Sequence, residues 1–390
     1  MTDSRNRFSC TRGSTLVAAL LLAAASLLGA CGSDSITGPQ AESCGPGPYF
    51  TVLPAAASEL ANVAIFGGVD APGHTLPTAH GGLFFTHGGV TLRAPGDITV
   101  TDLRRVRYTG PDVPQGSEDY AIFFQVCREV TGWFGHVATL APKFSPATVD
   151  YGNCRTYSVI WATIESCEAM DLDIKMSAGE DLGTSEGVTD VGMRDERVTN
   201  FYVSPWRFGG ANHAVCMWEQ WDAANQEVLF SRMRDGLRPE IVPTGEPRCG
   251  TMEVDVAGTA KGVWAETGVT EPVAGDETRY IALVNYPYRP QTELALSLGP
   301  ESLGAQIGIV SHRTSGRVNL AFEHVTPDGL IYCYGPDVGP WAWAAGSWFL
   351  SLTSETTLRI EHIGHGPGES PCADDPGTWS FGGGAVSMVR

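Results

Sequence analysis

Residues 91–137 read TLRAPGDITVTDLRRVRYTGPDVPQGSEDYAIFFQVCREVTGWFGHV, and this stretch decides the fold class of the chain. Short apolar runs alternate here with turn-forming glycine and proline. The run Tyr120–Val126 (YAIFFQV) has the length and the aromatic and β-branched content of a buried strand. Turn signals of this density separate strands more often than they separate helices. We therefore expect a mostly β protein.

Similar runs recur toward the C-terminus, and most of them lie between turn signals. These runs are residues 318–325, 330–334, 348–352 and 357–363. The first of them alternates Val318, Leu320 and Phe322 with other residues, which is the two-residue period of a half-buried strand. Pro327-Asp328-Gly329 separates the first run from the second and predicts a hairpin turn.

Two segments favour helices. Residues 55–65 contain good helix formers. Residues 213–233 are followed by Gly236, which suits a left-handed C-cap, and Arg232 and Arg234 would complement the negative end of the helix dipole. The sequence therefore predicts one or two helices beside the strands.

The N-terminus has the features of an export signal. Arg5, Arg7 and Arg12 precede the apolar run Leu16–Ala30, which is too short to span a membrane comfortably. The run ends in Leu-Gly-Ala followed by Cys31, which resembles the lipobox of bacterial lipoproteins. That resemblance implies cleavage before Cys31 and attachment of lipid to its thiol. The alternative is an ordinary secretory signal with a cysteine near the cleavage point by chance.

The remainder of the chain divides at changes in composition. Residues 1–30 would be the signal peptide, and residues 31–48, rich in glycine, serine and proline, would be a flexible tether. The chain beyond is longer than one core usually serves. Pro243–Gly250 interrupts the apolar pattern, so we expect one β-domain over residues 49–245 and an antiparallel β-sandwich or small barrel over residues 250–390.

Charge and cysteine content limit the function classes. The formal net charge is −19, with dispersed acidic residues and no basic cluster beyond the signal, which argues against nucleic acid as a partner. Eight cysteines remain besides Cys10 and Cys31, and none of them forms a Cys-x-x-Cys pair. In an exported protein they could form up to four disulfides, whose connectivity spacing alone does not reveal. Free buried thiols are the alternative.

The order of motifs from Gly73 to Leu140 resembles the lysostaphin or LytM-type zinc endopeptidases of cell-wall turnover. That family runs from a His-x-Gly-x-Asp ligand motif, through a P-V-Y-A-P-A-D-G-T-V hairpin, to a T-x-Y-A-H-L strand. Residues 91–100 match the hairpin at five positions, and residues 131–137 (TGWFGHV) stand in the place of the final strand. The resemblance implies a small β-barrel or sandwich in which the turn reverses the chain between two strands. It places His136 in the cleft.

The ligand set of the family is incomplete in this chain. Members of the family supply a histidine and an aspartate four residues apart, together with the second histidine of a His-x-His. In this chain Thr78 stands four residues after His74, and no His-x-His occurs. Catalytic zinc needs three protein ligands and an open position for water. His74, His80 and Asp190 are the candidates for a shifted ligand set, with zinc as the cofactor in that case.

We therefore expect a non-catalytic, lipid-anchored protein of the bacterial cell envelope, periplasmic or on the outer surface, that binds peptidoglycan or an envelope protein through its peptidase-like cleft. An active zinc metallopeptidase with the shifted ligand set is the alternative. A carbohydrate-binding module is a third possibility, because Trp341 and Trp343 could stack on sugar rings from one strand face. Packing in the core of a β-domain explains these two tryptophans equally well.

Overall fold

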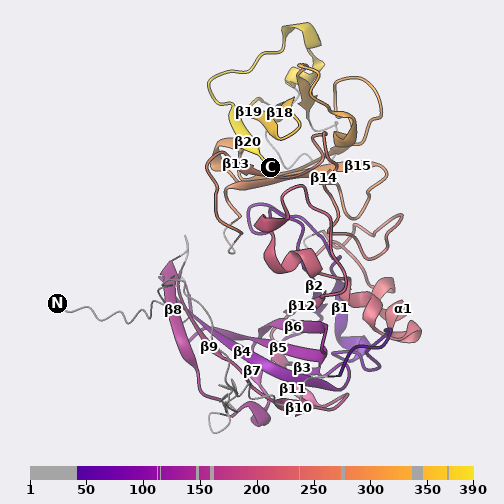
Figure 1. The fold of residues 1–390 in the computed structure, drawn as a ribbon, viewed down its shortest axis with the longest axis vertical. Coiled ribbons are helices and arrows are strands. Elements are labelled where there is room, and N and C mark those ends of the chain that lie inside the picture. The colour runs from indigo at the N-terminus through magenta and orange to yellow at the C-terminus, as the bar shows by residue number, and fades with distance from the viewer. Residues whose placement is uncertain are drawn as a thin grey trace, which may run out of the picture. The chain divides into compact units, whose positions relative to one another are not determined.

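Antiparallel sheets hold most of the regular structure in the computed structural model, so the prediction of a mostly β protein is confirmed (Figure 1). The structure describes residues 42–111, 113–114, 116–145, 149–158, 162–236, 238–273, 277–335, 346–366 and 369–390. Residues 41–390 belong to one compact unit. The predicted signal peptide, the lipidation site at Cys31 and the two tryptophans Trp341 and Trp343 lie outside the described residues.

The largest sheet has nine strands, in the order β1-β2-β12-β6-β5-β4-β9-β8, and β10 pairs with β4. In chain order these strands are β1 (Leu60–Val63), β2 (His80–Phe85), β4 (Ile98–Thr109), β5 (Glu118–Cys127), β6 (Val130–Val137), β8 (Gly152–Ser158), β9 (Thr163–Ala169), β10 (Ile174–Met176) and β12 (Val188–Asp195). All of their pairings are antiparallel.

One face of the large sheet shares a hydrophobic core with a three-stranded sheet. This second sheet consists of β3 (Val90–Arg93), β11 (Asp181–Ser185) and β7 (Thr139–Leu140). Ile122 and Phe134 of the large sheet are fully buried together with Leu92 and Leu182 of the small one. Because side chains alternate along a strand, the residues between them point to the opposite face of the large sheet. That opposite face carries the candidate site.

The C-terminal half forms an eight-stranded antiparallel sheet that curls into a nearly closed barrel, drawn in orange to yellow in Figure 1. Its strands are β13 (Gly262–Glu266), β14 (Tyr280–Asn285), β15 (Glu293–Leu298), β16 (Gln306–Ser311), β17 (Tyr332–Tyr334), β18 (Ser347–Ser354), β19 (Thr357–Ile363) and β20 (Val386–Val389). Trp264, Tyr334 and Trp348 fill the interior, at 1%, 0% and 0% exposure. The predicted barrel or sandwich in this half is thus present as a barrel.

The segment between the two halves contains the single described α-helix, α1 (Ala223–Ser231). The side chain of Asp222 caps its first turn by accepting a hydrogen bond from the backbone N–H of Asn225. Trp218 and Trp221 precede the helix, are fully buried, and donate their indole N–H groups to backbone carbonyls of residues 64 and 52. No helix in the described part of the chain has the length and apolar character of a membrane span.

Both helix predictions need correction. Residues 55–65 form a short 3-10 turn followed by β1, because Leu60 and Val63 pair with β2 and thereby satisfy their backbone groups in a sheet. The helix predicted over residues 213–233 is limited to α1, with a 3-10 turn at Met217–Gln220 before it. It ends at Arg232, so Gly236 is not its C-cap.

One strand prediction near the C-terminus, at residues 318–325, is wrong, whereas those at 330–334, 348–352 and 357–363 correspond to β17, β18 and β19. Asn319 adopts a left-handed φ of 52° and residues 322–324 form a 3-10 turn, so residues 318–325 are not a continuous strand. Pro327–Gly329 consequently joins no pair of strands, and β17 pairs with β18 instead. Leu320 and Phe322 are nevertheless buried, as their apolar character requires.

The turn after β3 also differs from the expectation that the resemblance supplied. Residues 94–97 lead the chain from the small sheet into the large one, because β3 pairs with β11 and β4 pairs with β5 and β9. The carbonyl of Pro95 accepts hydrogen bonds from the N–H groups of Thr51 and Val52. This turn is therefore a corner between two layers and not a hairpin within one sheet.

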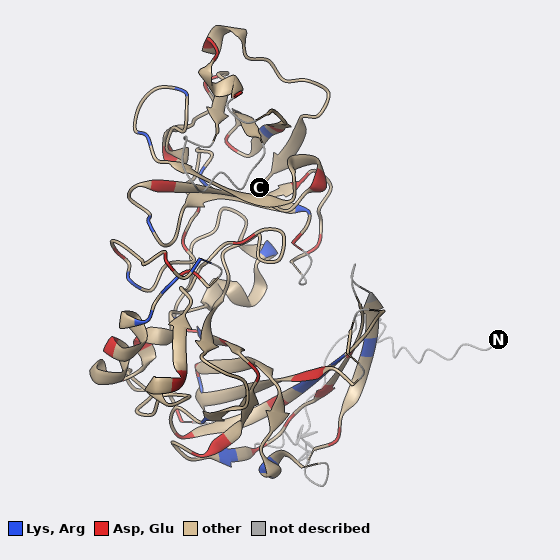
Figure 2. Ribbon diagram, turned by 180° about the vertical axis from the view of Figure 1, so that it is seen from behind, with Lys and Arg blue, Asp and Glu red and all other residues tan. Residues whose placement is uncertain are grey.

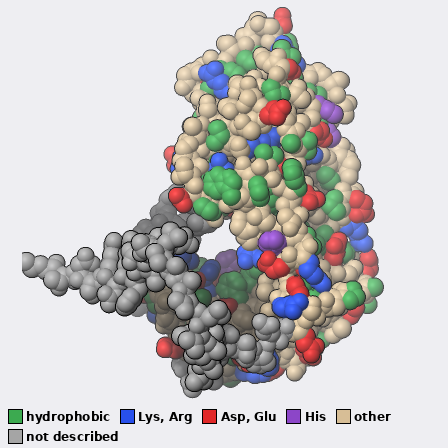
Figure 3. Space-filling model, viewed as in Figure 1, with side chains coloured by type: hydrophobic (Ala, Val, Ile, Leu, Met, Phe, Trp, Pro, Cys, Tyr) green, Lys and Arg blue, Asp and Glu red, His purple; other side chains and the backbone are tan. Residues whose placement is uncertain are grey.

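Four disulfides join the eight cysteines that were expected to form them. The pairs are Cys44–Cys127, Cys154–Cys167, Cys216–Cys249 and Cys333–Cys372. Disulfides persist in oxidising compartments, so they indicate an extracytoplasmic protein. Acidic and basic side chains are interspersed along the ribbon and over the visible face, in agreement with the dispersed charge of the sequence (Figures 2 and 3).

Candidate functional site

Three of the candidate residues predicted from the sequence lie on adjacent strands of the large sheet. His80 is the first residue of β2, Asp190 lies in β12 and His136 lies near the end of β6. Since β12 is paired with both β2 and β6, Asp190 sits opposite Gly82 on one side and Gly135 on the other. Neither glycine has a side chain that would cover the carboxylate. The sheet thus brings together residues that are far apart in the sequence.

Asp190 lies between two imidazole rings. Its Oδ1 is 3.7 Å from Nδ1 of His80, and its Oδ2 is 3.4 Å from Nε2 of His136. His74, in the loop before β2, completes the group with its ring centroid 5.3 Å from that of His80. The structure therefore gathers all four residues that the sequence singled out as metal or cleft candidates.

Asp119 of β5 is a member of this cluster that the sequence reasoning missed. Nδ1 of His136 is 2.9 Å from Oδ2 of Asp119, and the hydroxyl of Tyr108 donates to the same oxygen at 3.1 Å. His136 has a left-handed φ of 55°, which is uncommon for a residue with a side chain. Nothing in the sequence near Asp119 signals this contact, because it depends on the register between β5 and β6.

The pKa values of the histidines shift in opposite directions. The hydrogen bond with Asp119, aided by the charge of Asp190, raises the pKa of His136 above its ordinary value. Burial, together with the neighbouring ring of His80, lowers the pKa of His74. The shift of His136 favours the imidazolium form, which two carboxylates flank, and the shift of His74 favours the neutral form.

A cavity of about 190 Å³ opens beside the cluster. It is lined by His74, His80 and Asp190, and also by the ring of Phe84, four residues after His80. Its far wall contains a buried ion pair in which Arg238 and Asp235 lie 2.7 Å apart, and the hydroxyl of Tyr286 also donates to Asp235. Asp70, another lining residue, has its pKa raised by burial.

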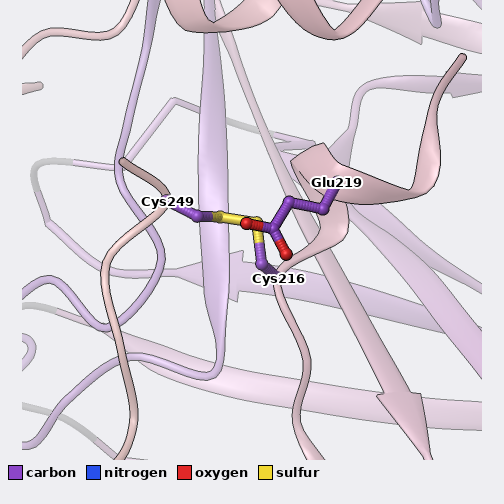
Figure 4. Close-up of side chains that lie close together, drawn as sticks. All are labelled: Cys216, Glu219 and Cys249. Atoms are coloured by element: carbon purple, nitrogen blue, oxygen red, sulfur yellow. A yellow bond between two sulfur atoms is a disulfide. The ribbon is translucent and has the colours of Figure 1, made fainter. Parts of the chain in front are cut away.

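A metal-ligating arrangement is not assembled in the histidine cluster. Within the described residues, one group of three His, Cys, Asp or Glu ligand atoms lies within 4.8 Å of one another, and it consists of Cys216, Glu219 and Cys249. Figure 4 shows that the two sulfurs of this group are bonded to each other. A metal binds cysteine as a thiolate, so the disulfide removes these ligands. Burial raises the pKa of the remaining Glu219.

The geometry explains why the histidines and Asp190 do not form a single metal cage. His80 and His136 face different oxygens of Asp190 rather than a common point. His136 is engaged on both ring nitrogens. These contacts instead form a chain of hydrogen bonds and ion pairs from Tyr108 through Asp119 and His136 to Asp190.

Trp133 lies next to the histidine cluster, on the face of the large sheet that points away from the core. We call this face the open face. The ring of Trp133 lies 6.5 Å from that of His80, and the guanidinium of Arg194 lies 5.3 Å from the centre of the Trp133 ring. Gly192, on the neighbouring strand, makes room for it, because a Cβ there would be 1.9 Å from Cζ2 of Trp133. The glycine thus permits the indole to lie over the sheet.

Trp348, the third tryptophan of the C-terminal aromatic segment, is fully buried in the barrel and donates its indole N–H to the carbonyl of Leu303 at 3.2 Å. It therefore packs in the core of the barrel.

Comparison of the chain with protein-family models, curated proteins and solved structures gives no match.

Proposed function

We propose that this protein is a non-catalytic envelope lipoprotein whose peptidase-like sheet binds peptidoglycan through the open face that carries the histidine cluster. The observation that carries the proposal is the self-contained network of Asp119, His136, Asp190 and His80. Its charged groups are paired with one another, and no three of these residues converge on a common point. Such a network can bind a polar ligand without a metal.

The sequence around β2 supports the absence of catalysis. His80-Gly81-Gly82-Leu83-Phe84 has the spacing of the His-x-Gly-x-Asp motif of the lysostaphin-type family, with Phe84 at the position of the acid. A phenyl ring offers no ligand atom, and here it lines the cavity in place of a carboxylate. The histidine and glycine of the motif are thus matched from His80, whereas counting from His74 places Thr78 at the position of the acid. A pseudoenzyme that has kept the fold and lost a zinc ligand fits this pattern.

The chemistry of the open face suits a cell-wall polymer. The Trp133 side chain is partly exposed, with the guanidinium of Arg194 over its ring, and an aromatic side chain at such a site can stack on a sugar ring. Arg194 is exposed beside Trp133, so its guanidinium can contact a peptide carboxylate. Peptidoglycan contains both sugars and acidic peptides, which makes it a better candidate than a neutral glycan.

Sedimentation of the full chain with insoluble peptidoglycan tests the proposal. We expect the wild type to sediment with the polymer and Trp133→Ala to reduce the bound fraction about fivefold or more, as loss of a central aromatic contact usually does. Trp206→Ala is the matched control, because Trp206 is 49% exposed but lies outside the site. Equal sedimentation of the two variants, or none by the wild type, would contradict the proposal.

A zinc hydrolase with ligands His74, His80 and Asp190 is the second candidate. The observation that favours it is that all three residues line one cavity. Neutral imidazole is the form that binds a metal, and His74 favours that form. One tightly bound zinc per purified full chain, lost in His74→Ala, would establish this candidate and overturn the non-catalytic one.

Lipid attachment at Cys31 is part of the proposal and rests on the sequence alone. The anchor and the tether over residues 31–48 would hold the folded part close to a membrane on the outside of the cytoplasm. Cys31→Ser should release the protein from the membrane fraction while leaving its disulfides intact. A variant that stays membrane-bound would contradict lipidation at this residue.

A further inference from the structure

A second recess lies on the core-facing side of the large sheet, away from the histidine cluster. It has a volume of about 560 Å³, within the range of small-molecule sites, and shares no lining residue with the first cavity. Glu118 and Tyr120 of β5 line it, whereas Asp119, between them, faces His136. Because strand side chains alternate, the two recesses lie on opposite faces of the sheet. The opposite wall is formed by β7 and by residues 141–145 and 149–151.

Arg105 of β4 lies in this recess, where its positive charge helps to lower the pKa of the Glu118 carboxyl. The neighbouring arginines of β4 are both paired: Arg104 lies 3.0 Å from Glu168, and Nε of Arg107 lies 3.0 Å from Glu118. The Arg105 side chain makes neither a hydrogen bond nor an ion pair with any described residue, and its Nε is buried without an acceptor. The described residues thus leave hydrogen-bonding capacity of this guanidinium unused.

Tyr151 supplies the second polar group of the recess. Its hydroxyl is buried and has no hydrogen-bond partner among the described residues, while its ring lies 4.9 Å beneath the guanidinium of Arg105. A guanidinium and a phenol held together are donors that a single acceptor could satisfy. Buried polar groups are almost always paired in folded proteins, so two adjacent groups without partners point to a ligand.

The remaining lining specifies the class of ligand. Leu140, Ala141, Phe144 and Val149 provide an apolar wall beside the two donors. The carboxylate of Glu118 also lies in the recess, where it accepts hydrogen bonds from Tyr120 and Arg107 and has a lowered pKa. A negative charge at that position disfavours multiply charged anions such as phosphates.

We propose that this recess binds the free carboxylate end of a peptide with a small aliphatic C-terminal residue. One carboxylate oxygen accepts from the Arg105 guanidinium and the other from the Tyr151 hydroxyl, and the aliphatic side chain packs against Leu140 and Phe144. The volume has room for more than one residue of such a peptide. This site is independent of the proposed function of the histidine face.

Calorimetric titration of the full chain with N-acetyl-alanyl-alanine and with its C-terminal amide tests the proposal. The two probes have nearly the same shape, and only the acid carries a charge. We expect the acid to bind about tenfold more tightly or better, because a charged hydrogen-bond pair is lost with the amide. Arg105→Gln should abolish this preference. Arg104→Gln is the matched control and should keep it.

Tyr151→Phe is a second variant that tests the site even if Arg105→Gln fails to fold. Removal of one hydroxyl leaves the ring in place, and we expect the affinity for the acid to fall about threefold while the preference over the amide persists in part. Equal affinities for acid and amide, a preference that survives Arg105→Gln, or unchanged affinity in Tyr151→Phe would each overturn the proposal. No binding of the acid at about 20 mM would overturn it as well.

Discussion

The barrel and the large sheet use their strand faces in different ways. β14 and β15 of the barrel are buried along nearly their whole length, with Trp264 and Trp348 inside. β5 and β6 of the large sheet bury one face and leave half-exposed residues on the other. The titratable cluster occurs on this second kind of face. The histidine cluster thus occupies a face of the sheet that the core does not need.

The comparison also distinguishes two roles of tryptophan. In the barrel a tryptophan fills space that would otherwise be empty, whereas on the open face Trp133 lies over a glycine and is reached by solvent. The barrel should therefore determine stability and the open face should determine binding. Substitutions in the two regions provide the test.

The largest difference should come from tryptophan truncation. Trp264→Ala removes a side chain that is 1% exposed and donates its indole N–H to Ala260, and we expect a loss of about 3–5 kcal/mol in the free energy of unfolding. Trp133→Ala should cost about 1 kcal/mol or less, since that ring is partly hydrated already. Urea denaturation of both variants measures this difference. Similar losses would show that Trp133 is a core residue.

A smaller effect is expected from Gly192→Ala. The added Cβ would lie 1.9 Å from Trp133, so the indole must move, at a cost of about 1–3 kcal/mol typical of overpacking. Gly383→Ala is the control, because nothing lies within 4 Å of a Cβ there. Tryptophan fluorescence should shift in the first variant and remain unchanged in the second. An unshifted spectrum would mean that the indole is not held over Gly192.

The smallest effect concerns the two histidines with shifted pKa values. Because the folded pKa of His136 is raised, its stabilising contribution is complete below about pH 6.5 and is lost as the pH rises through the folded value. His136 is half exposed, so we expect less than about 1 kcal/mol. Denaturation of His136→Asn between about pH 5 and 9 should show the largest deficit at the acidic end.

His74 should behave in the opposite way, since its folded pKa is lowered. The wild type then loses stability as the pH falls below about 6.5, where the unfolded chain takes up a proton that the folded chain resists. His74→Asn should remove this loss. The same pH trend in both variants would contradict the assignment of the two rings to different environments.

Part of the site was accessible from local sequence. His74, His80, His136 and Asp190 stood out because they lie in Gly-rich motifs of a recognisable order. Asp119 and Arg105 did not, because their roles depend on strand register and on which neighbours pair with them. Leu60–Val63 was assigned to a helix because its residues favour helices, and the edge of β2 decided otherwise by pairing with it.

The sequence by itself determined that the chain is mostly β, that eight cysteines were available for up to four disulfides, and that the segment around Cys31 has the pattern of a lipidation signal, because these follow from local periodicity and composition. Only the tertiary structure decided which cysteines pair, that residues 318–325 are not a strand, and that Asp119 contacts His136. Such outcomes depend on pairing between distant strands, where the backbone groups of one segment are satisfied by another. Local patterns carry little information about that choice.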